Sequence, residues 1–119
     1  MKLSDDSDRQ QGPSGPTATL LEAIVRQRCV SATYNRTRMV LAPHILYTRA
    51  GALYADAYIV SRENMLPREE KIGTFKVDGL SELVLTQRDF APSALFDATL
   101  DKYAGTALMA IEPQEQAAA

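Results

Sequence analysis

Hydrophobic and polar positions alternate most regularly in residues 51–60, which read GALYADAYIV. Successive side chains of a strand point to opposite faces, so alternate residues share a face. One of the two sets is aliphatic: Leu53, Ala55, Ala57 and Ile59. The other set is aromatic and mixed in polarity: Tyr54, Asp56, Tyr58 and Val60. The segment therefore predicts a strand that covers a core with one face and offers a binding surface on the other.

The pattern around this segment predicts one helix followed by a series of strands. Apolar residues at helical spacing, with Thr19 as N-cap and Glu22 three residues later, predict an amphipathic helix over about residues 18–28. Alternation predicts strands over 29–34, 38–48, 53–60, 71–77 and 83–85. Pro43 lacks a backbone donor, so the second strand is predicted to be an edge, to carry a bulge or to break in two. Further on, Ser93 is predicted to cap a short helix that ends at Gly105.

Consecutive strands with short connections are typical of antiparallel meanders and small barrels. We therefore expect a mainly β fold with flanking helices, of the α+β class: a small Sm-like or SH3-like antiparallel barrel preceded by one amphipathic helix. The barrel domain is expected to span residues 17–87, and residues 88–111 to form a C-terminal extension with a short helix. Residues 1–16 are predicted to be a disordered tail and residues 112–119 a frayed end, because neither buries enough apolar surface.

Composition narrows the class of protein. The chain has 119 residues, enough for one domain, and no apolar run approaches the roughly 20 residues that span a bilayer. The first residues lack the apolar core of a signal peptide, so we expect a cytoplasmic protein without membrane contact. The single cysteine, Cys29, is predicted to be a small buried residue, and the single histidine, His44, to be exposed or hydrogen-bonded to a neighbour. No metal-ligand spacing or catalytic set is evident, so we expect no metal, no cofactor and no enzymatic activity.

The charges favour an anionic ligand. Residues 17–96 hold ten Lys and Arg against eight Asp and Glu, whereas both ends of the chain are acidic. Arginine forks match phosphate geometry, and tyrosine faces stack on bases. The candidate ligand-binding residues are Arg36, Arg38, Tyr54, Arg68 and Lys76. Asp56 is expected to pair with one of the arginines and orient it. The alternative interpretation is that these arginines are ordinary solvated charges and the tyrosines edge residues of the core.

An amphipathic helix is followed by a strand ending at Tyr34, then by Pro43, Leu46 and Tyr47, the aromatic strand LYADAYI and the segment FKVDGL. The order of these features resembles the WYL domain of bacterial transcriptional regulators. The resemblance covers about residues 20–87.

Individual positions match the family unevenly. Tyr54 stands at the tyrosine of the Trp-Tyr-Leu signature, whereas Leu53 and Ala55 replace its other two residues. In the later segment, which in the family reads like Phe-Arg-Leu-Asp-Arg-Ile, Phe75 and Asp78 match. Lys76 and Gly79 stand there in place of arginines.

The resemblance implies an Sm-like barrel that binds a small effector or a nucleic acid in regulation. Family members usually follow a winged helix-turn-helix, but only about 16 residues precede the first helix here, so we expect a stand-alone domain that acts alone or with a separate DNA-binding protein. The predicted function is to sense a small anionic or nucleotide-like effector, or single-stranded nucleic acid, through a basic and aromatic face. The alternative is a protein-interaction or homodimer-forming module that uses exposed edge strands.

Overall fold

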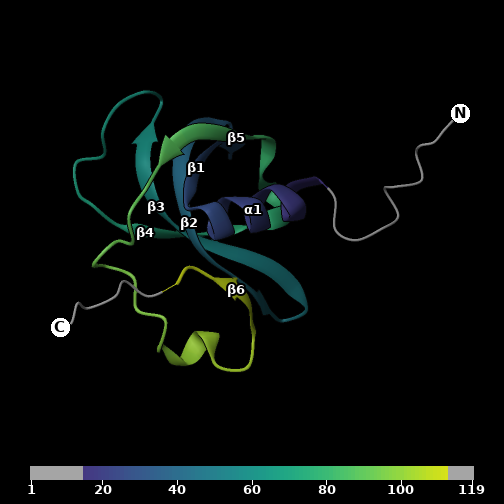
Figure 1. Ribbon diagram of the computed structural model, residues 1–119. Coiled ribbons are helices and arrows are strands. Elements are labelled where there is room, and N and C mark those ends of the chain that lie inside the picture. The colour runs from purple at the N-terminus through teal and green to yellow at the C-terminus, as the bar shows by residue number, and fades with distance from the viewer. Residues whose placement is uncertain (1–14, 113–119) are drawn as a thin grey trace, which may run out of the picture.

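One helix, six strands and two short 3₁₀ turns follow one another in the computed structural model, which describes residues 15–112 (Figure 1). The elements are α1 (Gly15–Arg26), β1 (Arg28–Tyr34), β2 (Thr37–Arg49), β3 (Ala52–Arg62), β4 (Ile72–Lys76), η2 (Val77–Gly79), β5 (Ser81–Asp89), η3 (Asp101–Tyr103) and β6 (Ala107–Ala110). The five predicted strands are present in the predicted order. The tails predicted over 1–16 and 112–119 lie almost entirely outside the described residues.

Strand β2 is the centre of the sheet. The strands run antiparallel in the order β4-β3-β2-β1-β5, and β6 also pairs with β2. The first half of β2 pairs with β1 and its second half with β6, while β3 follows it along nearly its whole length. The α+β organisation is therefore confirmed, but among the described strands the sheet does not close, because β4 and β5 remain its two edges.

A bulge interrupts β2 at Pro43. The register pairs Pro43 with Ala57 and then Ile45 with Asp56, so His44 has no partner on β3. Of the three predicted outcomes for this proline, the bulge is the one that occurs. The carbonyl of His44 instead accepts a hydrogen bond from the backbone N–H of Ile111, at 2.9 Å. The bulge thus creates the attachment point for the end of the C-terminal extension.

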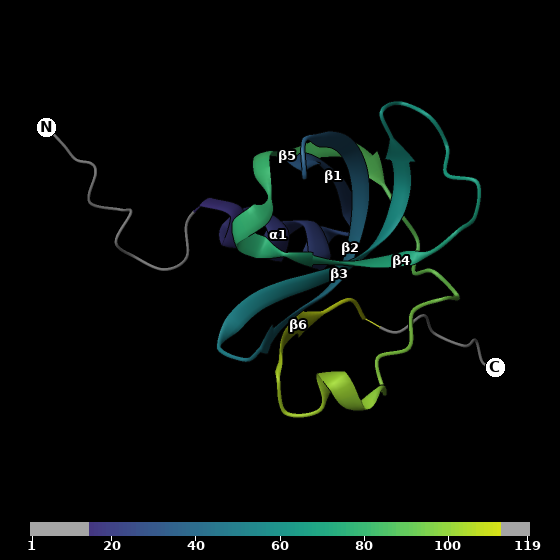
Figure 2. The same ribbon diagram turned by 180° about the vertical axis from the view of Figure 1, so that it is seen from behind.

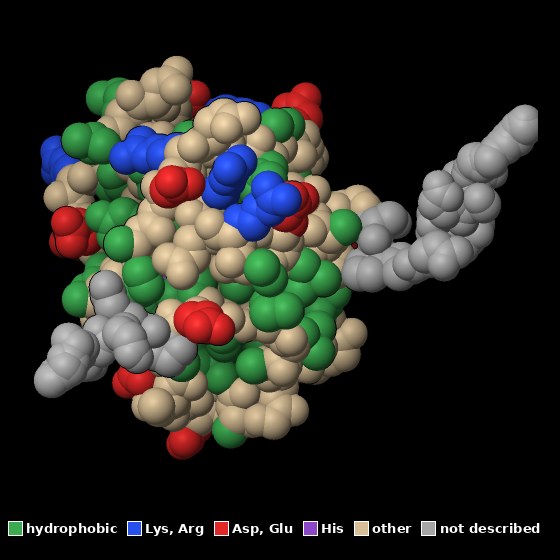
Figure 3. Space-filling model, viewed as in Figure 1, with side chains coloured by type: hydrophobic (Ala, Val, Ile, Leu, Met, Phe, Trp, Pro, Cys, Tyr) green, Lys and Arg blue, Asp and Glu red, His purple; other side chains and the backbone are tan. Residues whose placement is uncertain are grey.

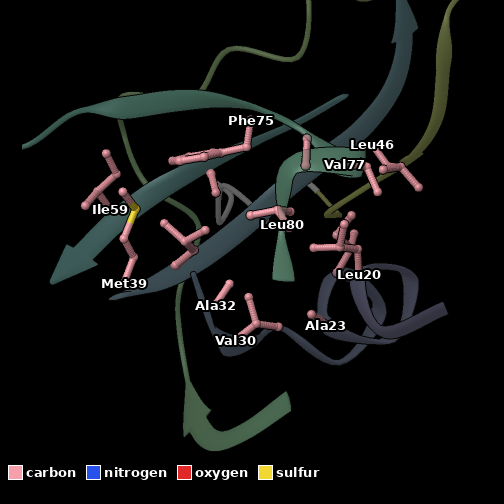
Figure 4. Packing of buried hydrophobic residues seen from close by; sticks show 14 of the residues in the cluster. Leu20, Ala23, Val30, Ala32, Met39, Leu46, Ile59, Phe75, Val77 and Leu80 are labelled. Atoms are coloured by element: carbon pink, nitrogen blue, oxygen red, sulfur yellow. The ribbon is translucent and has the colours of Figure 1, made fainter. Parts of the chain in front are cut away.

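Helix α1 covers the main core on one face of the sheet. Leu20, Ala23 and Ile24 of α1 are buried against the strands, and Figure 4 shows Leu20 and Ala23 facing side chains from the strands and from η2. The helix begins at Gly15, before the predicted start, so Thr19 is not the N-cap; its hydroxyl donates to the carbonyl of Gly15 at 3.3 Å. Thr19 therefore satisfies its hydroxyl inside the helix.

The predicted alternation of side chains along β3 is confirmed, but the aromatic face is partly covered, since Asp56 on it is buried. Ala55, Ala57 and Ile59 belong to the main core under α1. On the opposite face, Tyr54 packs against a second, smaller cluster formed by Ile45, Tyr47 and Tyr103.

The C-terminal extension lies across the second cluster, and β6 joins it to β2 (Figures 1 and 2). The helix predicted over 93–105 is wrong apart from the single 3₁₀ turn η3. Local side chains take the backbone donors that a helix would use: Asp97 accepts from the N–H of Thr99 at 2.9 Å, and Ser93 Oγ accepts from the N–H of Leu95 at 3.1 Å.

Candidate functional site

Asp56 is a buried carboxylate that joins β3 to the extension. Its side chain is 2% exposed, and its carboxylate accepts hydrogen bonds from three side chains. The Tyr47 hydroxyl donates to Oδ1 at 2.7 Å, and the Tyr103 hydroxyl donates to Oδ2 at 2.5 Å. The Lys102 Nζ lies 2.8 Å from Oδ2. The expected arginine partner of Asp56 is therefore wrong, since the cation comes from η3.

The electrostatics of this group favour a structural role. Burial alone would raise the pKa of Asp56, but hydrogen bonds from Lys102, Tyr103 and Tyr47 hold the pKa below its ordinary value. The pKa of Tyr103 is raised, first by burial and then by its bond to Asp56. Asp56 stays ionised with both oxygens engaged, which makes it an anchor for the extension.

His44 is a second buried polar anchor. Its ring is fully buried, so the prediction of an exposed residue is wrong, whereas the alternative of a hydrogen-bonded residue is confirmed. Nδ1 lies 2.7 Å from the carbonyl oxygen of Ala42 and Nε2 accepts from the N–H of Ser93 at 2.9 Å. A carbonyl only accepts and an N–H only donates, so the ring must be neutral with its proton on Nδ1. Burial lowers the pKa of His44 in the same direction.

Two hollows of about 420 and 400 Å³ meet at the end of β3. They share Ile59, Arg62 and Lys71. The first is lined by the β3–β4 loop, including Arg68, and the second by Tyr34 and Phe75 near the β1–β2 turn. We call the combined hollow the basic groove and define it by Arg62, Arg68 and Lys71.

Local backbone geometry brings these cations together. Glu63 and Asn64 have φ values of 54° and 66°, and Arg62 and Met65 exchange backbone hydrogen bonds across them at 2.9 and 3.0 Å. Positive φ at both central residues is the geometry of a tight type I′ turn. This turn folds the loop back over the strand end, and the carbonyl of Lys71 closes it by accepting from the N–H of Ile59 at 3.2 Å.

An aromatic pair forms one wall of the basic groove. The rings of Tyr34 and Phe75 meet edge to face with centroids 5.0 Å apart. A Cβ at Gly79 would lie 2.9 Å from Cε1 of Tyr34, so only glycine leaves that ring its place. Gly79 stands where the family resemblance has an arginine, and here it serves the packing of Tyr34.

The charge of the basic groove is largely uncompensated. Arg62, Arg68 and Lys71 are exposed, and none of them forms an ion pair within residues 15–112. Glu69 is the one acidic residue lining the two hollows. On the face seen in Figure 3, Lys and Arg side chains gather in the upper half, over the region of β1, β3 and β5, whereas acidic ones occur in both halves. The three cations without ion pairs therefore favour anions in the basic groove.

The structure separates four of the five predicted ligand residues into two groups. Arg68 lines the basic groove, and Arg36 lies in the β1–β2 turn between Asn35 and Thr37, which line it too. Tyr54 and Lys76 are paired across β3 and β4. They lie toward the other end of β3, roughly 26 Å from Arg62 at about 3.3 Å per residue.

Arg38 is held by hydrogen bonds at the sheet surface, with its side chain 42% exposed. Its guanidinium donates to Thr33 Oγ1 at 2.9 Å, to Ser31 Oγ at 2.9 Å and to the carbonyl of Glu82 at 3.0 Å, so it links β1, β2 and β5. Tyr54 stacks on Tyr47 with centroids 6.1 Å apart. Sequence reasoning missed Arg62 as a candidate, although basic residues at both ends of the loop SRENMLPREEK were the signal.

The chain folds as an antiparallel α+β domain with one covering helix and a basic groove at the end of β3. Residues 17–85 match the sequence model of the WYL domain, and the chain therefore belongs to the WYL domain family. WYL domains are generally regulatory, ligand-sensing domains. No curated protein and no solved structure matches the chain. Lys102 and Tyr103, which anchor the extension, lie outside the matched residues.

Two further observations bound the site. Within residues 15–112, no three His, Cys, Asp or Glu side chains come together as a metal-binding group. Among the same residues, no helix combines the length and the apolar character that crossing a membrane requires.

Proposed function

We propose that this WYL domain is a non-enzymatic sensor that binds a phosphorylated, nucleotide-like anion in the basic groove and acts in transcription regulation. The observation that carries the proposal is that Arg62, Arg68 and Lys71 line two connected hollows without ion pairs in the described chain. Guanidinium groups donate two parallel hydrogen bonds to phosphate oxygens, and an ammonium adds a point charge. Of the residues predicted from sequence, Arg68 and Arg36 are proposed to take part.

The size of the groove suits this ligand. Its two hollows of about 420 and 400 Å³ each fall within the usual range for small-molecule sites, roughly 300–1,000 Å³. Phosphates are proposed to lie between the three cations, and a base or another planar group against Tyr34. The curved, Sm-like half-open barrel that the family resemblance implies would leave the basic groove accessible to a ligand.

The test compares a groove variant with a charge-matched control. Arg68→Ala removes one groove cation, and Arg49→Ala removes an exposed cation whose guanidinium carbon lies 4.8 Å from the Tyr54 ring centroid, away from the groove. Titration with nucleoside diphosphates and short oligodeoxynucleotides, followed by calorimetry, should show saturable binding to the wild type. Arg68→Ala should weaken it about tenfold, the value of one charged hydrogen-bonded contact, and Arg49→Ala should not. Equal weakening by both variants, or no binding of any phosphorylated ligand, would contradict the proposal.

The salt dependence of the binding affinity distinguishes a single nucleotide from an oligonucleotide as the ligand. An oligonucleotide that displaces several counterions gives binding that falls steeply with salt concentration, whereas one nucleotide gives a shallow dependence. The slope of log affinity against log salt therefore decides whether the domain senses a small effector or single-stranded nucleic acid.

The open sheet edges favour a second candidate function, homodimer formation. Within the described chain β4 and β5 each pair on one side only, and unpaired edges add strands from other chains. However, β5 carries two register shifts against β1, and such irregularities discourage edge pairing. A concentration-dependent dimer in light scattering, with no anion binding, would favour this candidate.

A further inference from the structure

A third hollow lies on the face of the sheet opposite the main core. It has a volume of about 430 Å³ and is lined by β1, β2, β3, the β3–β4 loop and residues 88–94. We call it the front cavity. Among its lining residues only Leu66 also lines the basic groove, so the two are separate sites.

Small residues on adjacent strands create the floor of the front cavity. Ala42 is paired with Tyr58 on β3, and the register that pairs Leu41 with Val30 brings Cys29 beside Ala42 on the other side. Both Ala42 and Cys29 are buried, with side chains too short to fill the space between Tyr58 and Phe90. The row across the three strands therefore leaves a hollow beside the half-buried rings of Tyr58 and Phe90, while Ala42 and Cys29 beneath it are 2% and 0% exposed.

The outer wall of the front cavity is fixed by hydrogen bonds. The N–H of Phe90 donates to the carbonyl of Gln27 at 2.9 Å, and the Gln27 side chain donates back to the carbonyl of Phe90 at 3.2 Å. The Ser93 N–H is held by His44, whose ring stacks on Phe90 with centroids 5.0 Å apart. This wall is built into the fold and is preorganised for a ligand.

Two opposite charges line the front cavity without meeting. Arg88 comes from the end of β5 and Glu70 from the β3–β4 loop. Within residues 15–112 they form no ion pair with each other or with any other residue. The remaining charged residue of the lining, Asp89, lies 3.8 Å from the Nε of Arg28. The cavity thus offers one cation and one anion without an ion pair, Arg88 and Glu70, together with Asp89 as a second carboxylate that is 82% exposed.

We infer that the front cavity binds a small zwitterion, namely an α-amino acid with an apolar or aromatic side chain. The Arg88 guanidinium takes the carboxylate in a two-pronged contact, and the Glu70 carboxylate takes the ammonium group. The side chain of the ligand lies against the half-buried rings of Tyr58 and Phe90, above Ala42 and Cys29. A ligand with only a negative charge would be repelled by Glu70, and one with only a positive charge would be repelled by Arg88. A zwitterion can pair its carboxylate with Arg88 and its ammonium group with Glu70.

Calorimetric titration with L-phenylalanine tests this inference. Two matched ligands each lack one group: 3-phenylpropanoate has no ammonium and 2-phenylethylamine has no carboxylate. We expect saturable binding of phenylalanine, and binding about tenfold or more weaker for both matched ligands, because each leaves one charged group of the cavity unpaired. Equal binding of either matched ligand, or no saturable binding of phenylalanine and L-leucine, overturns the inference.

Variants tie the binding to the front cavity. Arg88→Gln and Glu70→Gln change exposed side chains, so folding should be retained, and each should weaken phenylalanine binding about tenfold. Arg68→Ala, in the basic groove, should leave phenylalanine binding unchanged, and Arg88→Gln should leave nucleotide binding unchanged. The proposal for each site can therefore be contradicted without affecting the other. Full phenylalanine affinity in Arg88→Gln would overturn the assignment.

Discussion

Replacing Asp56 with alanine should detach the C-terminal extension and destabilise the whole domain. The substitution removes the acceptor for the hydroxyls of Tyr47 and Tyr103 and the partner of Lys102. Tyr47 and Tyr103 are 0% and 5% exposed, so their hydroxyls would stay buried without a partner. An unsatisfied buried polar group costs its full desolvation, which makes this a large perturbation.

The expected loss is about 3–5 kcal/mol in the free energy of unfolding, the range for breaking a buried charged pair. Domains of this size have roughly 5–15 kcal/mol in total, so the variant should retain only part of its stability. Lys102→Met should cost less, about 1–2 kcal/mol, because the Lys102 side chain is 39% exposed and water screens the pair. Since the pKa of Asp56 is lowered, its contribution is complete above the ordinary pKa of 3.8 and is lost as pH falls through the folded-state pKa.

Urea unfolding at neutral pH measures these losses, and limited proteolysis reports on the extension. Asp101→Asn is the matched control, since it removes an exposed carboxylate from the same turn and should change stability by less than about 0.5 kcal/mol. Cleavage within residues 92–106 should become faster in Asp56→Ala but not in Asp101→Asn. A loss below about 1 kcal/mol in Asp56→Ala would refute the argument that buried hydroxyls and charge depend on this carboxylate.

Three further predictions concern single residues. Because His44 must be neutral when folded, and burial lowers its pKa from 6.5, stability should be constant above about pH 7 and fall below pH 6.5 by up to about 1.4 kcal/mol per pH unit. His44→Gln should abolish that slope in urea unfolding between pH 5 and 8; a slope unchanged in the variant contradicts the assignment. Leu20→Ala should lower the free energy of unfolding by about 2–5 kcal/mol, because it leaves a cavity between α1 and the sheet. A loss under about 1 kcal/mol would show that α1 is not packed on the sheet. Gly51→Ala, at φ +81° in open space, should lower stability by roughly 1 kcal/mol through backbone strain alone, whereas no change in thermal unfolding would rule that strain out.

The succession of strands along the chain and the alternation of side chains on β3 were predictable, because the alternation of apolar and polar residues is a local property of the sequence. The same holds for Pro43, whose missing donor forces an irregularity wherever the strand pairs. The burial of His44 was not predictable, because the bulge changes the side of the sheet that the following residues face. The family resemblance rested on local order too, and the match over residues 17–85 confirms it.

The candidate sites depend on contacts between distant segments. Asp56 contacts Lys102 and Tyr103 only because the extension returns to β2. The pattern of residues near Asp56 in the sequence does not predict that contact. Arg62 and Lys71 come together through a turn with positive φ at Glu63 and Asn64. A glycine at either position would have indicated such a turn in the sequence, whereas Glu and Asn do not. The predicted residues Tyr54 and Lys76 pair with each other, but their distance from the groove follows from strand length and register, which sequence does not fix.

The most direct test of the basic groove is an amide NMR titration with a nucleoside diphosphate. Saturable chemical-shift changes are expected, and they should be largest at the backbone amides of Arg62, Arg68 and Lys71. Amides of η3 and of the β2–β3 turn should stay in place, since neither lines the groove. The absence of saturable changes, or changes centred on Tyr54 and Lys76 instead, would contradict the assignment of the anion site to the groove.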